Sequence, residues 1–172
     1  EGLAMMILTK LNNFLAKASY LVGIIIVAIM VMALSLSAIT RYVSGTGYDW
    51  LIELPPVLIC WLVFPLLGPL LREGNHIQVD FLTSIISTKQ AKYLKIMMNL
   101  TAFIASLIFF KAGVEATILY FNLGQMMELE IDVPIWWMYL SFPVGFIILA
   151  LFSLELTTQS ILELNHKKAK DA

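Results

Sequence analysis

The sequence predicts an all-α integral membrane protein, one membrane domain built from four transmembrane helices. Of its 172 residues, 60% are hydrophobic and only 13% are charged, whereas a soluble domain carries about 25% charged residues. The mean hydropathy is +0.86. The apolar residues come in four long runs, each sufficient to cross a hydrocarbon layer of about 30 Å as a helix. The spans are expected at residues 18–40, 50–71, 91–123 and 134–157.

The first span, residues 18–40, contains no charged residue. Its flank, residues 5–17, places apolar residues at helical spacing between Lys10 and Lys17, which predicts a lead-in helix lying along the membrane interface. A basic flank before an apolar run is also typical of a signal peptide. Because this run is longer than the apolar region of a signal peptide, we expect a span that is retained.

The second span, residues 50–71, is expected to be kinked. Asp49 is placed to cap its start, and four prolines lie within it: Pro55, Pro56, Pro65 and Pro69. Each proline removes a backbone donor or clashes with the preceding turn, so the helix should pack against protein. An irregular packed span is favoured over a moving gate.

The pattern changes after Arg72. Apolar residues in 77–87 recur at helical spacing between polar ones, which predicts a short amphipathic helix on the membrane surface between spans 2 and 3. Ser87 and Gln90 form a capping-box signal, so a long third helix should begin near Thr88. Pro134 suits the first turn of span 4, whose entry carries an aromatic belt.

The orientation follows from the basic residues. Lysine and arginine gather before span 1, between spans 2 and 3 and in the C-terminal tail. Loop 1, which connects spans 1 and 2, offers only Arg41, and loop 3, which connects spans 3 and 4, offers no basic residue. The positive-inside rule therefore predicts that both termini are cytoplasmic. Glu155, at the cytoplasmic end of span 4, is expected to meet the basic inner surface.

Charged residues within or beside spans are the candidate functional groups, because a charge in mid-membrane costs about 2.5–3.5 kcal/mol on insertion scales. Lys111 and Glu115 are spaced i,i+4 on span 3 and can form an ion pair; a proton or ion relay is the alternative. Arg41 and Glu53 lie at the outer ends of consecutive spans and could meet across loop 1, where an interhelical or intersubunit salt bridge is expected.

Several function classes are disfavoured. The net charge of −1 provides no basic face for a nucleic acid. The single cysteine, Cys60, forms no CxxC pair, and the two histidines, His76 and His166, lie outside the spans, so neither a metal site nor a bis-histidine haem is expected. No nucleophile stands near a base. We therefore expect no cofactor, no metal and no catalytic residue.

Several short motifs follow one another in the stretch from Arg41 to Leu82. They are Arg41-Tyr42, Trp50, Glu53, Trp61, Gly68 and Arg72-x-Gly74-x-His76-Ile77-x-Val79-Asp80. Trp50 and Glu53 open span 2, and Trp61 and Gly68 lie inside it. In the order and spacing of these motifs the stretch resembles the small membrane subunit of tripartite ATP-independent periplasmic (TRAP) transporters. Among family versions the sequence is most similar to the sialic-acid one. It departs from the family where paired acids often open span 2, since Ile52 precedes Glu53 here.

The resemblance implies a role and partners. Such subunits bind a larger membrane subunit that carries the substrate and sodium sites and moves as an elevator, while a soluble periplasmic protein delivers an organic acid. This chain would then be a static scaffold in the bacterial inner membrane, surrounded by phospholipids, with Arg41, Glu53, Arg72, Gly74, His76, Asp80, Lys111 and Glu115 in structural or partner-binding roles.

Two other classes remain open at this point. One is the membrane anchor of an electron-transfer complex that binds quinone or haem. The other is a self-sufficient exporter, which needs a protonatable residue in mid-membrane; Lys111 and Glu115 are its only candidates.

Overall fold

The computed structural model describes the backbone of residues 2–83, 88–130 and 132–170, and the side chains of 3–74, 90, 92–130 and 132–162. Within these residues the chain is helical apart from its loops and one isolated β-bridge between Met126 and Pro134. The helices are α1 (Gly2–Ser44), α2 (Trp50–Thr83), α3 (Thr88–Leu123), α4 (Ile135–Tyr139) and α5 (Ser141–Lys170).

Four helical stretches are long and apolar enough to cross a membrane, which confirms the predicted all-α architecture. They are Leu3–Ser44, Trp50–Gly74, Lys92–Leu123 and Ile135–Leu162. The last stretch combines α4 and α5, which are separated only by Leu140.

Two helices extend further than the sequence predicts. The lead-in segment of residues 5–17 is part of α1, which continues without a break into the first span. Likewise α2 continues to Thr83, past the expected end of span 2 at residue 71. The predicted surface helix of residues 77–87 is therefore not separated from span 2 at its start, and residues 84–87 lie outside the described part. Its position on the membrane surface stays a prediction.

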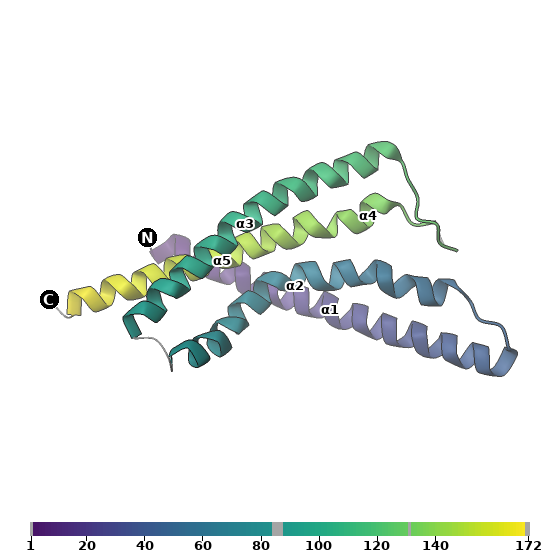
Figure 1. Cartoon of the computed structure of the whole chain (residues 1–172), viewed down its shortest axis with the longest axis horizontal. Helices are drawn as coiled ribbons and strands as arrows, with labels where there is room; N and C mark the ends of the chain where they lie inside the picture. Colours follow the sequence, from purple (N-terminus) through teal and green to yellow (C-terminus); the bar gives the residue numbers. More distant parts are fainter. Residues whose placement is uncertain (1, 84–87, 131, 171–172) are drawn as a thin grey trace.

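The helices form two pairs. α1 packs along α2, and α3 packs along α4 and α5. The pairs meet where α2 crosses α5 and diverge toward the ends that carry the loops after α1 and α3 (Figure 1). The start of α1, the end of α2, the start of α3 and the end of α5 gather at the opposite end of the molecule (Figure 1).

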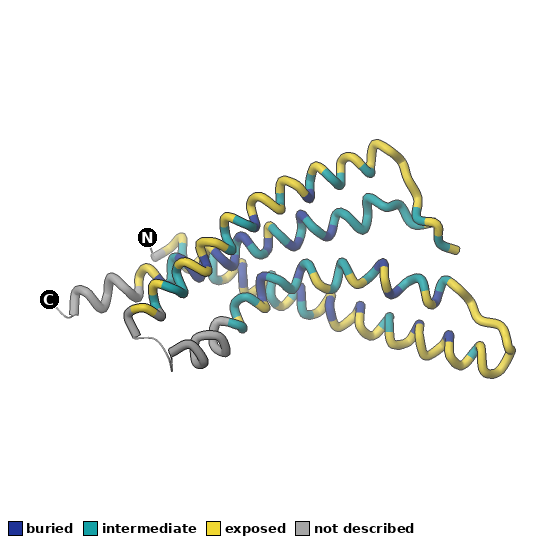
Figure 2. Tube along the Cα trace, viewed as in Figure 1, coloured by how far each residue is buried: buried dark blue, intermediate teal, exposed yellow. Residues whose placement is uncertain are grey.

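α5 is the centre of the bundle. It contacts α1, α2 and α3, and more buried residues lie along it than along any other helix, whereas the outer sides of α1 and α3 are exposed (Figure 2). The Phe152 side chain is fully buried, with 0% exposure. Since a membrane-embedded helix presents apolar residues to lipid, the apolar outer sides of α1 and α3 are compatible with a lipid or protein environment.

Glycines set the closeness of this packing. A Cβ added at Gly145 of α5 would lie 2.5 Å from the backbone carbonyl of Phe64 on α2. A Cβ at Gly113 of α3 would lie 3.0 Å from Pro143 of α5, and one at Gly68 of α2 would lie 2.8 Å from the Phe152 ring. Small residues at helix crossings allow this approach, which is the usual source of packing energy between membrane helices.

Candidate functional site

Polar groups at the loop end of the bundle join α2 to its neighbours. Arg41, in the last turn of α1, pairs with Asp49 in loop 1, with 3.8 Å between guanidinium nitrogen and carboxylate oxygen. Glu53 instead accepts a hydrogen bond of 2.8 Å from the backbone N–H of Glu130 in loop 3. The expected salt bridge between Arg41 and Glu53 is therefore wrong within one chain, because Asp49 reaches the guanidinium and loop 3 occupies the Glu53 carboxylate; a bridge between subunits stays a prediction.

Loop 3 is fastened to the start of α2 by a reciprocal pair of hydrogen bonds. The Glu130 carboxylate accepts from the Trp50 N–H at 2.8 Å, while Glu53 accepts from the Glu130 N–H. Leu129 and Val133 line a small cavity of about 30 Å³ against Trp50 and its neighbours on α2. A carboxylate at a helix start satisfies an unpaired amide and complements the helix dipole. We name this arrangement the loop 3 clamp. The sequence predicts Asp49 as the cap of this helix, whereas the carboxylate that accepts from the Trp50 N–H belongs to Glu130.

A second polar group lies at the opposite end, between α1 and α2. The Arg72 guanidinium donates to the Asn13 side-chain oxygen at 2.7 Å, and the Tyr20 hydroxyl donates to the Glu73 carboxylate at 2.6 Å. These residues and Lys17 line an open groove of about 460 Å³. Arg72 therefore acts within the chain to hold α2 against α1, in agreement with a structural role.

Three residues of the same motif follow Arg72 closely in sequence. Gly74 lies in α2, and a Cβ built there meets no described atom within 4 Å, so no packing contact among the described residues requires a glycine at this position. The side chains of His76 and Asp80 lie outside the described residues. Their expected partner-binding roles stay predictions.

A buried polar cluster joins α1 to α5. The Asn12 amide donates to the Glu155 carboxylate at 2.7 Å and to the Leu151 carbonyl at 3.1 Å. Gln159 donates to the other Glu155 oxygen at 3.1 Å. Glu155 and Asn12 are 1% and 0% exposed. The expectation that Glu155 meets a basic surface is therefore wrong, because Asn12 of the lead-in segment supplies one amide donor to the buried carboxylate and Gln159 of α5 supplies another.

Lys111 and Glu115 form the ion pair that their spacing predicts. The ammonium nitrogen lies 3.8 Å from the carboxylate oxygen, and the two side chains are 80% and 68% exposed. The pair therefore sits on the outside of α3, directed away from the bundle. This confirms the pairing, while the alternative of a relay through the bundle interior does not fit an outward-facing pair.

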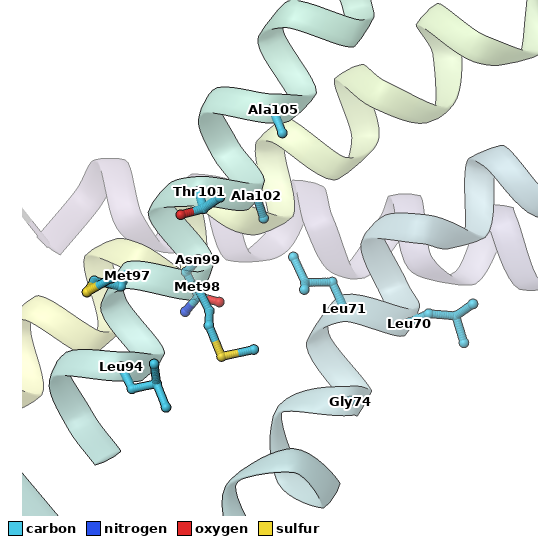
Figure 3. Close-up of a pocket in the computed structure, with 10 residues that line it drawn as sticks. All are labelled: Leu70, Leu71, Gly74, Leu94, Met97, Met98, Asn99, Thr101, Ala102 and Ala105. Atoms are coloured by element: carbon cyan, nitrogen blue, oxygen red, sulfur yellow. The ribbon is translucent and has the colours of Figure 1, made fainter. Parts of the chain in front are cut away.

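An apolar groove opens between α2 and α3, two helices that contact each other only over a short stretch. It encloses about 510 Å³. Leu71 and Gly74 lie on its α2 side, and Met98 and Asn99 lie on its α3 side (Figure 3). Asn99 is 1% exposed, and its side-chain nitrogen has no hydrogen-bond partner among the described residues.

Metal ligands do not cluster in the described residues, where no group of three or more His, Cys, Asp or Glu side chains could hold an ion. Cys60 is half-buried within α2. The polar groups described above instead connect one helix to another: α1 to α2, α1 to α5, and loop 3 to α2.

Comparison with protein families distinguishes the transporter subunit from the electron-transfer anchor and the self-sufficient exporter. The model of the family "Tripartite ATP-independent periplasmic transporters, DctQ component" matches residues 30–162, well over half of the chain. The chain belongs to the DctQ family. Comparison with curated proteins gave no match, and comparison with solved structures gave none.

Membership of the DctQ family makes the chain the small membrane component of a TRAP transporter. The family implies partnership with the large membrane component and with a periplasmic binding protein. DctQ proteins are transporter components, so the family gives no support to the alternative of an electron-transfer anchor.

Proposed function

We propose that this DctQ component is a non-catalytic scaffold that holds the large component in place during sodium-driven uptake of an organic acid. The close packing of α5 against its neighbours carries this proposal. Gly145 brings the α5 backbone against Phe64 of α2, and Gly113 brings α3 against Pro143. Closely packed helices resist deformation, which suits a stationary frame beside a moving partner.

Hydrogen bonds at both ends of the bundle support the same role. The loop 3 clamp holds α2 to the α3–α5 pair at one end. The Asn12–Glu155 bond holds α1 to α5 at the other end. Because these bonds connect neighbouring helices near both ends of the bundle, the chain is better suited to anchoring than to alternating access, which needs one bundle to rock against another.

We further propose that both termini face the cytoplasm and that the transported acid is sialic acid or a related organic acid. The first statement is supported by the distribution of lysine and arginine. The second is supported by the sequence resemblance of the Arg41–Leu82 stretch to the sialic-acid version. In the same proposal Arg41, Glu53 and Arg72 have structural roles, and Gly74, His76 and Asp80 contribute to partner binding.

Co-expression tests the scaffold proposal. A tagged DctQ chain should co-purify with the large component encoded in the same genome, and neither protein should transport alone when reconstituted in liposomes. Sodium-gradient uptake should need both membrane components and the binding protein. Uptake by this chain alone would contradict the proposal. Sialic acid and a dicarboxylate, tested in parallel, separate the two substrate classes.

A further inference from the structure

The outer side of α3 carries a stripe of exposed residues opposite the face that packs on α5. Its members recur with the alternating spacing of four and three residues that brings one side of a helix against another helix. They are Met97, Thr101, Ile104, Ile108, Lys111, Glu115 and Ile118, all exposed. We name this set the α3 seam. Ser106 and Gly113, on the opposite side, are buried.

The seam contains polar residues at a depth where lipid offers no partner. Tyr120 stacks on Tyr139 at 4.3 Å between ring centroids, and Phe121 contacts Trp136 at 5.6 Å. Such aromatic residues gather at the membrane–water boundary. Glu115 precedes Tyr120 by five residues and Lys111 precedes it by nine, which places them about 8 Å and about 14 Å further along the helix, inside the hydrocarbon layer.

The direction of the side chains does not bring the charges back to this boundary. In an α-helix the Cα–Cβ bonds tilt toward the N-terminus. The N-terminus of α3 is at the end away from the aromatic residues (Figure 1), so the Cα–Cβ bonds of Lys111 and Glu115 tilt away from the aromatic boundary. Snorkelling to the nearer surface would have to reverse that tilt.

The ion pair is also in the less favourable order for stabilising an isolated helix. Lys111 precedes Glu115, whereas the order with Glu first is the more favourable one at i,i+4. An exposed pair at this depth instead suits a protein partner whose own polar groups complete its hydrogen bonds, since intramembrane charges face protein or water-filled space.

We propose that the α3 seam is the docking surface for a transmembrane helix of the large component, with Lys111 and Glu115 bonded to a polar side chain of that helix. The proposal rests on the scaffold function proposed above. A polar position in an otherwise apolar seam fixes the register of two helices, because only one register gives it a partner. The pair thus sets how the two components align.

A second copy of this chain fits the seam less well. Copies inserted with the same topology associate about an axis along the membrane normal, so each residue of the seam faces its own counterpart. Lys111 would then oppose Lys111, and Glu115 would oppose Glu115, in a layer of low dielectric constant. Like charges in such positions disfavour association.

Photo-crosslinking tests the docking. A photoreactive amino acid is placed at Ile108 in the seam or, as a matched control, at Ile24 on the outside of α1; the two side chains are 63% and 68% exposed. The complex with the large component is purified from irradiated membranes. We expect the product with the large component to be at least about fivefold more abundant from position 108. Equal or lower abundance, a product with a second copy, or a product with lipid alone overturns the proposal.

A charge-free variant provides the second test. The double substitution Lys111→Leu and Glu115→Leu should lower the recovered large component by about threefold, the usual effect of a polar contact between membrane helices, while the variant alone melts at the temperature of the unmodified chain. If the seam faces lipid, recovery is unchanged. Failure of the unmodified chain to capture any large component contradicts the proposed function itself, whereas a complex that forms without the crosslink contradicts the docking alone.

Discussion

Replacing Gly145 by alanine should loosen the crossing of α2 and α5. We expect a larger loss of stability from this substitution than from Gly68→Ala or Gly74→Ala. The added Cβ would lie 2.5 Å from three atoms of Phe64, two of which belong to the backbone. A backbone cannot turn away as a side chain can. Ordinary contact begins at 3.4 Å, so the helices must separate by about 0.9 Å, which forfeits part of the dispersion energy along the crossing.

Overpacking of this kind costs about 2–3 kcal/mol. In a chain of this length the melting temperature should fall on the order of 5–10 °C. The single thiol, Cys60, is half-buried in α2. Unfolding in detergent exposes it to a thiol-reactive fluorescent dye, so the melting temperature can be measured without introducing another cysteine. The same complex-capture experiment used for the seam should show reduced recovery of the large component.

Two other glycines provide matched controls. Gly68→Ala meets the side chains of Phe152 and Ile148 at 2.8 and 2.9 Å, which can shift, so its effect should be smaller. Gly74→Ala meets nothing within 4 Å, and alanine is the better helix former, by about 1 kcal/mol; its melting temperature should be unchanged or higher. Equal melting temperatures for all three variants would refute the packing argument.

Three further predictions concern the polar groups. Glu130→Ala removes the cap of the loop 3 clamp, so the first amide of α2 should exchange with deuterium about fivefold faster. Glu128→Ala, at an exposed site in the same loop, should leave this exchange rate unchanged. Equal exchange rates in the two variants would contradict the clamp. Asn12→Ala leaves a buried carboxylate on α5 with one donor fewer and should cost about 1–3 kcal/mol, measured by the Cys60 melt; an unchanged melting temperature would count against the cluster. In a chain whose native cysteine is replaced by alanine, a cysteine at Thr46 should react with an impermeant maleimide added to the periplasm, and one at Lys168 should not; the reverse pattern would invert the proposed orientation.

The architecture was predictable because it depends on local sequence. Runs of apolar residues define the four spans, and the i,i+4 spacing of Lys111 and Glu115 fixes their ion pair. These features need no knowledge of how distant segments meet. The long-range contacts were not predictable in this way.

The errors share one physical cause. The sequence places Glu155 near a basic surface, whereas its partner is Asn12. Asn12 could not be predicted as the partner because it is 143 positions away and lies in a segment whose amphipathic pattern favours the membrane interface. Glu53 was paired with Arg41 across loop 1, whereas loop 3, which is 77 positions away, provides its donor. Periodicity shows which face of a helix is polar, but the partner of that face depends on the packing of the helices.

Sodium-gradient uptake in liposomes that contain the large component and are supplied with the binding protein, with and without this DctQ chain, tests the scaffold claim most directly. We predict uptake only when the chain is present, with the transport rate falling in parallel with complex recovery in Gly145→Ala. Undiminished uptake in liposomes that lack the chain would contradict the account.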